Sequence, residues 1–200
     1  MKFKIQSEAF CRIANAAAHP ESENPQLACV RLEHRDGKAY AVATSKQIIA
    51  IEFLGATDEP EGFINVPSSF AARLGSYDDE LTFSHWPEFT LGFVTVDELP
   101  GEMLYLLDPD NAEPMFSRWF DVIPRNPPRV DRGFMYINGE EFTKLVASSP
   151  TGCFAFAEVL DNTRVTIVRD IYADQWLGAF VPSAKNRADI KPATVPTWMP

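Results

Sequence analysis

The chain is poor in the residues that build metal sites and disulfide frameworks. Its three cysteines, Cys11, Cys29 and Cys153, are isolated and lie in apolar surroundings. An odd number of cysteines with no CxxC or Cys/His spacing indicates neither a disulfide scaffold nor a zinc site. Its three histidines form no HxxxH or HExxH pattern. We therefore expect buried free thiols, no metal and no cofactor.

Long apolar runs are also missing. No stretch is long enough to cross a bilayer, and the first ten residues, MKFKIQSEAF, lack the apolar segment of a secretory signal. We expect a cytoplasmic protein without a membrane partner. Gly-rich phosphate loops and the GxSxG nucleophile elbow are absent. No motif therefore indicates an enzyme, although catalytic groups can converge from distant positions.

Positive charge is in deficit. The 200 residues include 18 Lys and Arg against 28 Asp and Glu, which gives a formal net charge of −10. This balance argues against general adhesion to DNA or to anionic membranes, but it leaves room for a locally basic face. The hydrophobic content of 46% is sufficient for one or two domains with packed cores.

An internal repeat is the main positive feature, because repeats define architecture before any single residue does. Each of three units is predicted as a short strand, a helix and three further strands. The first has its helix from residue 7, with Ser7 as the N-cap, to about 15, and strands at 2–5, 27–33, 39–44 and 47–53. The second has a helix over 67–75 and strands at 63–66, 80–84, 90–96 and 103–107. The third has a helix over 139–148 and strands at 134–137, 154–160, 164–168 and 175–181.

Each predicted helix carries one basic residue beside an apolar stripe. These residues are Arg12, Arg73 and Lys144. Each of them taken alone fits an ordinary solvated helix position. Their recurrence at equivalent positions predicts one electropositive face, which suits a phosphate backbone.

The fold class that follows is α+β, with antiparallel sheets and helices on one face. Residues 1–107 are predicted to form a complete domain of two units. Residues 108–132 form a connector rich in Pro and Arg, with an apolar anchor at 119–123. Residues 133–183 form a third unit, or half domain, and 184–200 an extended tail.

Several segments, in order, resemble the bacterial sliding clamp, the processivity subunit of the replicative polymerase. The resemblance covers about residues 1–182, and its ordered segments are MKFKIQSEAFCRIANAAA at the start, Arg35-Asp36-Gly37-Lys38 followed by Tyr40-Ala41-Val42-Ala43-Thr44, Ile64-Asn65-Val66-Pro67, Trp119-Phe120-Asp121-Val122-Ile123-Pro124, and Ala179-Phe180-Val181-Pro182. Ser45 stands where the family usually has Asp. Clamp chains carry three domains of two units each, whereas this chain shows three units, as a shortened clamp encoded by a phage would.

The resemblance implies a non-catalytic DNA replication protein whose helices line a hole around double-stranded DNA. Arg12, Arg73 and Lys144 would then contact phosphates without reading bases. Three units cannot encircle DNA, so a homo-oligomer is implied. A polymerase or another replication protein would be the protein partner, in an apolar groove that Phe180, Val181 and Pro182 would border, although plain strand core is the favoured interpretation of these three.

Two alternatives stay open. The clamp fold can serve as an interaction module that binds or inhibits a host replication factor or another protein. The chain can also be a small enzyme built on an unrelated α+β fold.

Overall fold

The computed structural model describes residues 1–21, 23–75, 79–85, 93–96, 103–105, 116, 119, 138–158 and 165–180. The first unit comprises β1 (Lys2–Gln6), α1 (Ser7–Ala14), the short 3-10 helix η1 (Pro25–Leu27), β2 (Cys29–Arg35), β3 (Lys38–Thr44) and β4 (Ile48–Ala56). The second comprises β5 (Gly62–Pro67), η2 (Ser68–Phe70), α2 (Ala71–Leu74), β6 (Glu80–His85), β7 (Phe93–Val96) and β8 (Met103–Tyr105). The third comprises α5 (Gly139–Ser148), β9 (Phe154–Glu158), β10 (Thr166–Asp170) and β11 (Trp176–Phe180).

The predicted repeat is confirmed in all the parts that the structure describes. Each unit has one helix followed by three antiparallel strands. The predicted hairpin between β2 and β3 is confirmed as well, because Asp36 and Gly37 have φ of 51° and 69°, the left-handed values that a tight two-residue turn requires. The predicted opening strand of the third unit, at residues 134–137, lies outside the described residues.

The first two units exchange their opening strands. β1 of the first unit pairs with β6 in the sheet β1-β6-β7-β8, where Phe3 lies opposite Phe83. β5 of the second unit pairs with β2, where Ile64 lies opposite Leu32. Neither opening strand pairs with the strands of its own unit. The exchange joins the two units, while the domain limits at residues 107 and 133 stay a prediction.

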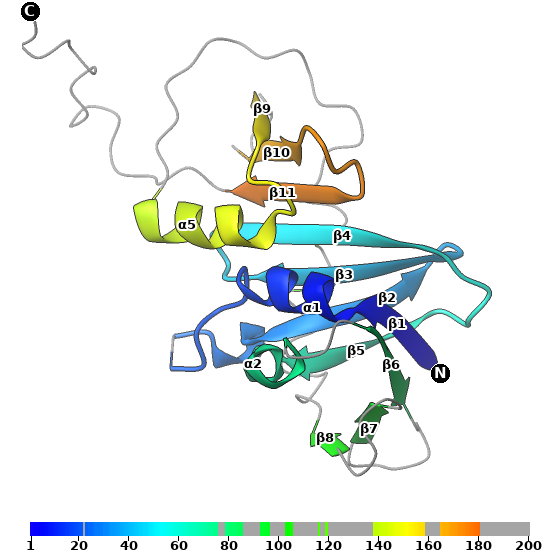
Figure 1. Cartoon of the computed structure of the whole chain (residues 1–200). Coiled ribbons are helices and arrows are strands. Elements are labelled where there is room, and N and C mark those ends of the chain that lie inside the picture. The colour runs from blue at the N-terminus through cyan, green and yellow to red at the C-terminus, as the bar shows by residue number, and fades with distance from the viewer. Residues whose placement is uncertain are drawn as a thin grey trace, which may run out of the picture.

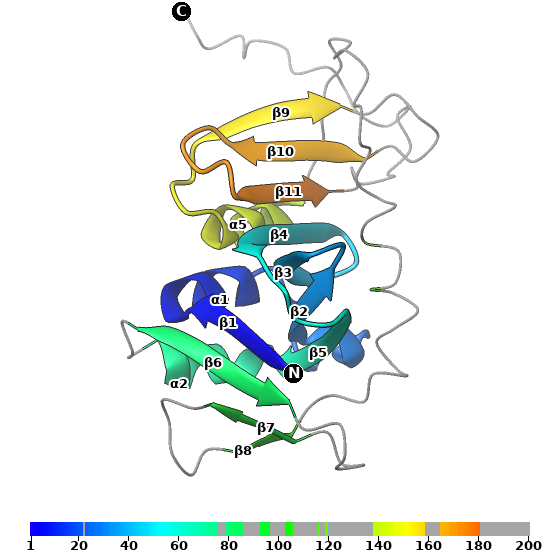
Figure 2. The same cartoon turned by 90° about the vertical axis from the view of Figure 1, so that its right-hand side faces the viewer.

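The first and third units share one sheet. Its order is β5-β2-β3-β4-β11-β10-β9, and the last strand of one unit pairs with the last strand of the other at β4 and β11. This antiparallel joint places Ile48 opposite Phe180 and Ile51 opposite Leu177. Figures 1 and 2 show the joint in the middle of the molecule, with the sheet running on across it.

The three helices lie side by side on one face, with α1 between α5 and α2 (Figures 1 and 2). The side chain of Asn15, just after α1, donates from Nδ2 to the carbonyl of Ala147 in α5 over 3.1 Å. On the other side of α1, Cys11 Sγ lies 3.2 Å from the carbonyl of Ala71 in α2. The expectation of helices on one face of antiparallel sheets is confirmed.

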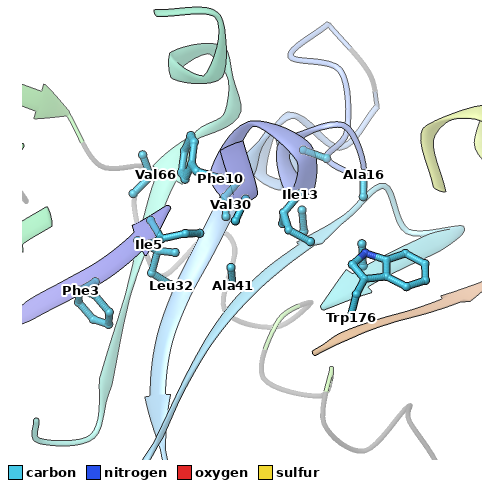
Figure 3. Close-up of a cluster of buried hydrophobic side chains, with 14 of the residues drawn as sticks. Phe3, Ile5, Phe10, Ile13, Ala16, Val30, Leu32, Ala41, Val66 and Trp176 are labelled. Carbon is cyan, nitrogen blue, oxygen red and sulfur yellow. The ribbon is translucent and has the colours of Figure 1, made fainter. Parts of the chain in front are cut away.

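The main core lies between these helices and the sheets. α1 buries Ala9, Phe10 and Ile13 at helical spacing, and its apolar stripe faces the inner side chains of the strands. Figure 3 shows Phe10 and Ile13 directed toward the strand residues, with Trp176 at the end near the joint. This burial explains why the short helix is stable in the fold, since isolated helices of this length are marginal in water.

A second core lies on the other side of the sheet. Its members come from β2, β3, β4 and β11, from Ala18, Leu27 and Val165 outside the strands, and from two residues of the predicted connector, Phe116 and Trp119, which are almost completely buried. The predicted apolar anchor of the connector is therefore confirmed at Trp119, while residues 120–123 lie outside the described residues. The anchor covers the outer face of the sheet at β2 and β3, where Trp119 contacts Glu33 and Tyr40.

Three detailed predictions are wrong: the N-cap of α1, the burial of all three thiols and the first residue of β2. Ser7 is not the N-cap of α1, because Gln6 holds that position without a side-chain bond, and the Ser7 hydroxyl donates instead to the carbonyl of Leu74. Cys153 is exposed rather than buried, and Cys11 is half-buried; of the three free thiols only Cys29 is buried. The strand expected over residues 27–33 starts at Cys29 instead of residue 27, because residues 25–27 form the 3-10 helix η1.

No helix among the described residues is long and apolar enough to cross a membrane.

Candidate nucleic-acid interface

The three basic residues singled out in the sequence belong to the three neighbouring helices. Arg12 is on α1, Arg73 on α2 and Lys144 on α5. The apolar residues expected beside them are buried, since Ile13, Leu74 and Leu145 are at most 1% exposed. The repeat therefore places one basic residue next to the buried stripe of each helix.

Arg12 is held by carboxylates of its own chain. Its Nη2 lies 2.7 Å from both carboxylate oxygens of Glu52 on β4, and its Nη1 lies 3.5 Å from Glu8 Oε1. The side chains of Arg12 and Glu52 are only 13% and 7% exposed. Burial raises the pKa of the Glu52 carboxyl, the Arg12 guanidinium lowers it, and the result is a pKa above its usual value. The charge of Arg12 is thus largely used inside the fold.

Lys144 is paired in a similar way. Its Nζ lies 3.0 Å from Glu141 Oε1 and 3.3 Å from Glu140 Oε1 on the same helix. Burial lowers the pKa of Lys144, but the hydrogen bonds and charges of the two glutamates raise it above its usual value. The hydroxyl of Ser45 donates to the other oxygen of Glu141. An Asp at position 45, as the resemblance leads one to expect, would set two carboxylates against each other, so Ser45 fits the contact with α5.

Arg73 has the most open position of the three. It is exposed in the last turn of α2, and its guanidinium carbon lies 5.8 Å from the centre of the Phe70 ring. Arg12 and Lys144 are half-buried by comparison. Of the three basic residues, Arg73 is therefore best placed to meet an anion approaching the helices.

The helix face carries as many negative as positive side chains. The charged residues of the three helices are Glu8, Arg12, Arg73, Glu140, Glu141 and Lys144. Glu8 and Glu140 are more exposed than the basic residues they accompany, at 91% and 76%. The helices of one chain therefore do not form the electropositive face that the sequence suggested, and DNA contact by the three basic residues stays a prediction.

The predicted partner groove is placed in part. Phe180 is 2% exposed, belongs to the main core and pairs with Ile48 across the joint. It is strand core, as the favoured interpretation has it. Val181 and Pro182 lie outside the described residues, and their part in a groove stays a prediction.

Solved structures of known proteins match this arrangement. The DNA polymerase III subunit beta from Pseudomonas aeruginosa superposes with a TM-score of 0.61 and 14% sequence identity, over 92% of this chain and 66% of that chain. The corresponding subunit from Borrelia burgdorferi superposes with a TM-score of 0.63 and 14% sequence identity, over 92% of this chain and 64% of that chain. The DNA polymerase sliding clamp from Bacillus subtilis superposes with a TM-score of 0.58 and 11% identity, over 92% of this chain and 64% of that chain. The chain has the sliding-clamp fold.

The resemblance noted in the sequence is thus confirmed for the fold, at a sequence identity that shows the fold alone. The chain spans just under two thirds of the length of these clamps. No family model matches it, and no curated protein matches it either.

One feature of this clamp fold escaped the sequence reasoning. Arg31, Glu33 and Arg35 alternate along β2, and Glu33 is only 3% exposed. Glu33 Oε2 lies 3.0 Å from Arg31 Nε and accepts a hydrogen bond from Trp119 Nε1 over 2.8 Å. Glu33 Oε1 lies 2.8 Å from Arg35 Nε. The guanidinium of Arg31 lies 3.6 Å from the centre of the Phe63 ring. The sequence shows this cluster only as an alternation of charged residues along a strand. In the structure, the bond from Trp119 to Glu33 attaches the connector to the sheet.

Within the described residues, no group of three or more His, Cys, Asp and Glu side chains is placed to hold a metal ion. The charged clusters found there consist of paired acids and bases. We see no arrangement among them that assembles a nucleophile with a general base.

Proposed function

We propose that the protein is a non-catalytic accessory factor of DNA replication that acts as a sliding clamp on double-stranded DNA. It would hold a polymerase or another replication protein on the duplex, and it would act as an assembly of several copies. A shortened clamp of phage origin fits the length of the chain.

The observation that carries the proposal is the placement of the three repeated helices. They lie next to one another on one face, backed by a sheet that continues across the joint between units. A row of helices on a continuous sheet gives a protein a smooth, rigid surface along which a duplex can move. Binding by such a surface depends on phosphate charge and not on base sequence.

The charges of the helix face refine this proposal. Arg12 and Lys144 are tied to glutamates, so a phosphate would have to compete with those carboxylates. Attraction to DNA should therefore be weak for one chain, and Arg73, the exposed one of the three, should contribute more to it than Arg12 or Lys144. Weak attraction suits a protein that must hold DNA without stopping on it.

The proposal is tested by the salt dependence of DNA binding. Fluorescence anisotropy with a labelled duplex at low salt would compare the wild type with Arg73→Glu. We expect several-fold weaker binding for the variant and a salt slope lower by about one unit, as for the loss of one phosphate contact. Lys38→Glu is the matched control, because Lys38 is an exposed residue at the start of β3, away from the helices. Equal losses for both variants, or no binding by the wild type, would contradict the proposal.

A second candidate is an interaction module with the clamp fold that binds another protein instead of DNA. The equal number of acidic and basic residues on the helices favours it, as does the net charge of −10. Exposed apolar side chains at Phe53, Ile171 and Tyr172 would suit a protein surface. Retention of a stoichiometric host protein after nuclease treatment, without any DNA binding, would favour this candidate. The enzyme hypothesis assumed an unrelated fold, which the structure does not have.

A further inference from the structure

His34 on β2 is a titratable base packed against the main core. Its side chain is 4% exposed, and its ring centre lies 4.3 Å from that of Phe3 on β1. In the described part of the chain, Nδ1 of His34 is buried without a hydrogen-bond partner. A neutral imidazole can pack here as an apolar ring does, whereas an imidazolium has to donate from both nitrogens. Protonation of His34 would therefore set an unsatisfied charge against Phe3.

The contact between His34 and Phe3 joins the two sheets of the fold. β1 pairs with β6 in the four-stranded sheet, whereas β2 and β5 belong to the seven-stranded sheet. Met1, just before β1, lies against Gly62 of β5, because a Cβ added to Gly62 would be 2.5 Å from Met1 Cε. Gly62 pairs with His34. The start of β1 thus rests on the part of the second sheet that holds His34.

A second histidine lies at the same end of β1. His85, the last residue of β6, donates from its N–H to the carbonyl of Met1 over 2.9 Å. The terminal ammonium of Met1 donates to the His85 carbonyl over 3.3 Å. His85 is half-buried, and its Nδ1 is a buried atom without a hydrogen-bond partner among the residues that the structure describes. One imidazole from each sheet therefore lies near the start of β1.

Both imidazoles are held in the neutral form. Burial lowers the pKa of His34, and the Met1 ammonium lowers it further. The Glu59 carboxylate and the Pro60 backbone act in the opposite direction, but the pKa of His34 stays below its usual value. Burial and the same ammonium lower the pKa of His85.

The carboxylate nearest to His34 in its effect is at the surface. Glu59 is exposed in the loop after β4, and its Oε2 accepts from the backbone N–H of Lys2 over 3.3 Å. Glu33 and Arg35, the neighbours of His34 in β2, pair with each other on the opposite face of the strand. A protonated His34 therefore gains water and the full attraction of Glu59 only by moving outward from Phe3.

We propose that His34, together with the start of β1, is an acid-sensitive contact between the two sheets. At neutral pH the ring packs on Phe3 and the contact is closed. In mild acid the imidazolium turns outward to water and Glu59, and the first residues of β1 separate from their neighbours. The two sheets are then less firmly joined at this end, while the joint of β4 and β11 is unchanged.

The direction of the effect follows from linkage. The open form holds His34 at an ordinary pKa of about 6.5, and the closed form holds it lower. The closed form is therefore favoured above about pH 6.5 and loses up to about tenfold in its equilibrium for each pH unit below that value. The raised pKa of Glu52 acts in the opposite direction, because protonation of that carboxyl stabilises the folded state. Loosening between pH 7 and pH 5 thus points to imidazoles.

Amide hydrogen exchange of the full chain at pH 7 and pH 5 tests the proposal. Each rate is divided by the intrinsic rate of an unfolded amide at the same pH. We expect exchange in residues 2–6 and 81–85 to be about tenfold faster at pH 5, and exchange in residues 166–170 and 176–180 to be unchanged. His34→Phe should abolish the difference, because it keeps an uncharged ring against Phe3. His19→Phe is the matched control at an exposed histidine, and it should keep the difference.

A wild type with equal protection of β1 at both pH values would overturn the proposal, and so would an undiminished difference in His34→Phe. A difference that disappears in His85→Gln but persists in His34→Phe would assign the effect to His85 and overturn it as well. NMR titration of the His34 ring in the wild type gives a readout that needs no variant. The ring should titrate over the same pH range in which β1 loses protection, and titration with β1 still protected would contradict the proposal. DNA plays no part in the contact, so the inference can fail while the proposed function stands.

Discussion

Arg12 on α1 and Glu52 on β4 form a buried ion pair next to the joint between the first and third units. One nitrogen of the guanidinium lies 2.7 Å from both oxygens of the carboxylate. Glu52 pairs across the joint with Trp176 of β11. The residue predicted from the sequence to meet DNA thus connects a helix to the strand at which two units join.

Loss of one member of this pair should be strongly destabilising. Arg12→Met leaves the Glu52 carboxylate buried without its cation, and we expect the free energy of unfolding to fall by about 3–5 kcal/mol near pH 7. Urea denaturation would measure it. Arg12→Met combined with Glu52→Leu should recover most of the loss, because it removes both charges. A double variant as unstable as Arg12→Met would show that the unpaired charge of Glu52 does not cause the loss of stability.

The pH dependence of Arg12→Met gives a second test of the same pair. The folded-state pKa of Glu52 is already raised by burial, and removal of Arg12 should raise it further. A carboxyl with a raised folded-state pKa holds its proton more tightly in the folded state, so stability rises as the pH falls through that pKa. The deficit of Arg12→Met relative to the wild type should therefore shrink from about pH 7 to about pH 5. A constant deficit would contradict the assignment.

Asp170 should make stability sensitive to strong acid. It is 2% exposed and accepts hydrogen bonds from the Ser149 hydroxyl, from the N–H and hydroxyl of Thr151 and from the N–H of Tyr172. Burial alone would raise the pKa of Asp170, but these bonds lower it to about 2. A lowered pKa stabilises the fold above the unfolded value near 4, and this contribution is lost as the pH falls toward 2.

The matched variant is Asp170→Asn. The shift corresponds to about 2 kcal/mol, and we expect the wild type to lose that amount between about pH 5 and pH 2 beyond what Asp170→Asn loses. Urea denaturation across this range would measure the difference. Parallel pH profiles for the two proteins would contradict the prediction.

Trp119 should be the connector's main attachment. Trp119→Phe keeps an aromatic ring against Tyr40, whose ring centre lies 5.4 Å away, but removes the donor to the buried Glu33. We expect a loss of about 1–3 kcal/mol, typical of a buried polar group that loses a partner. Trp119→Ala should lose about 3–5 kcal/mol, because it also leaves a cavity in the outer core. Equal stability of Trp119→Phe and the wild type would show that the bond to Glu33 contributes nothing.

Gly178 should be needed for the packing of α5 on β11. A Cβ at this position would lie 2.6 Å from Trp176 Cη2 and 2.8 Å from Leu145 Cδ1, closer than such atoms can approach. Gly178→Ala should therefore be destabilising by about 1–3 kcal/mol in thermal or urea denaturation. Gly139→Ala is the control, because its Cβ meets nothing and alanine favours the helix, so it should be neutral or stabilising by up to about 1 kcal/mol. The reverse order of the two variants would contradict the packing described for α5.

Most of the element order could be predicted from the sequence, because local signals fix it. The Asp36-Gly37 turn, the apolar spacing of α1 and the limits of α5 are properties of neighbouring residues. The exchange of β1 and β5 between units could not be predicted in this way. It depends on pairing between strands whose partner residues are about 74 to 82 positions apart for β1 and β6 and about 28 to 38 apart for β2 and β5, which no local pattern encodes.

The electrostatics of the site could be predicted only in part. The sequence shows a basic residue on each of three predicted helices. It also shows that Glu52 is the one charged residue in the otherwise apolar run from residue 48 to 53. That Arg12 binds Glu52 is a consequence of tertiary packing over 40 residues of sequence. Glu140 and Glu141 stand four and three residues before Lys144, and this helical spacing predicts the ion pairs that compensate its charge.

The central claim, that copies of this chain enclose DNA and slide on it, is tested most directly by blocking the ends of a linear duplex. The wild type would be incubated with DNA carrying biotin at both ends, then streptavidin would be added and the salt raised. We predict that the protein stays on the blocked DNA, leaves unblocked DNA, and is released when the blocked DNA is cut once in the middle. Equal retention on blocked and unblocked DNA, or no retention on either, would contradict the account.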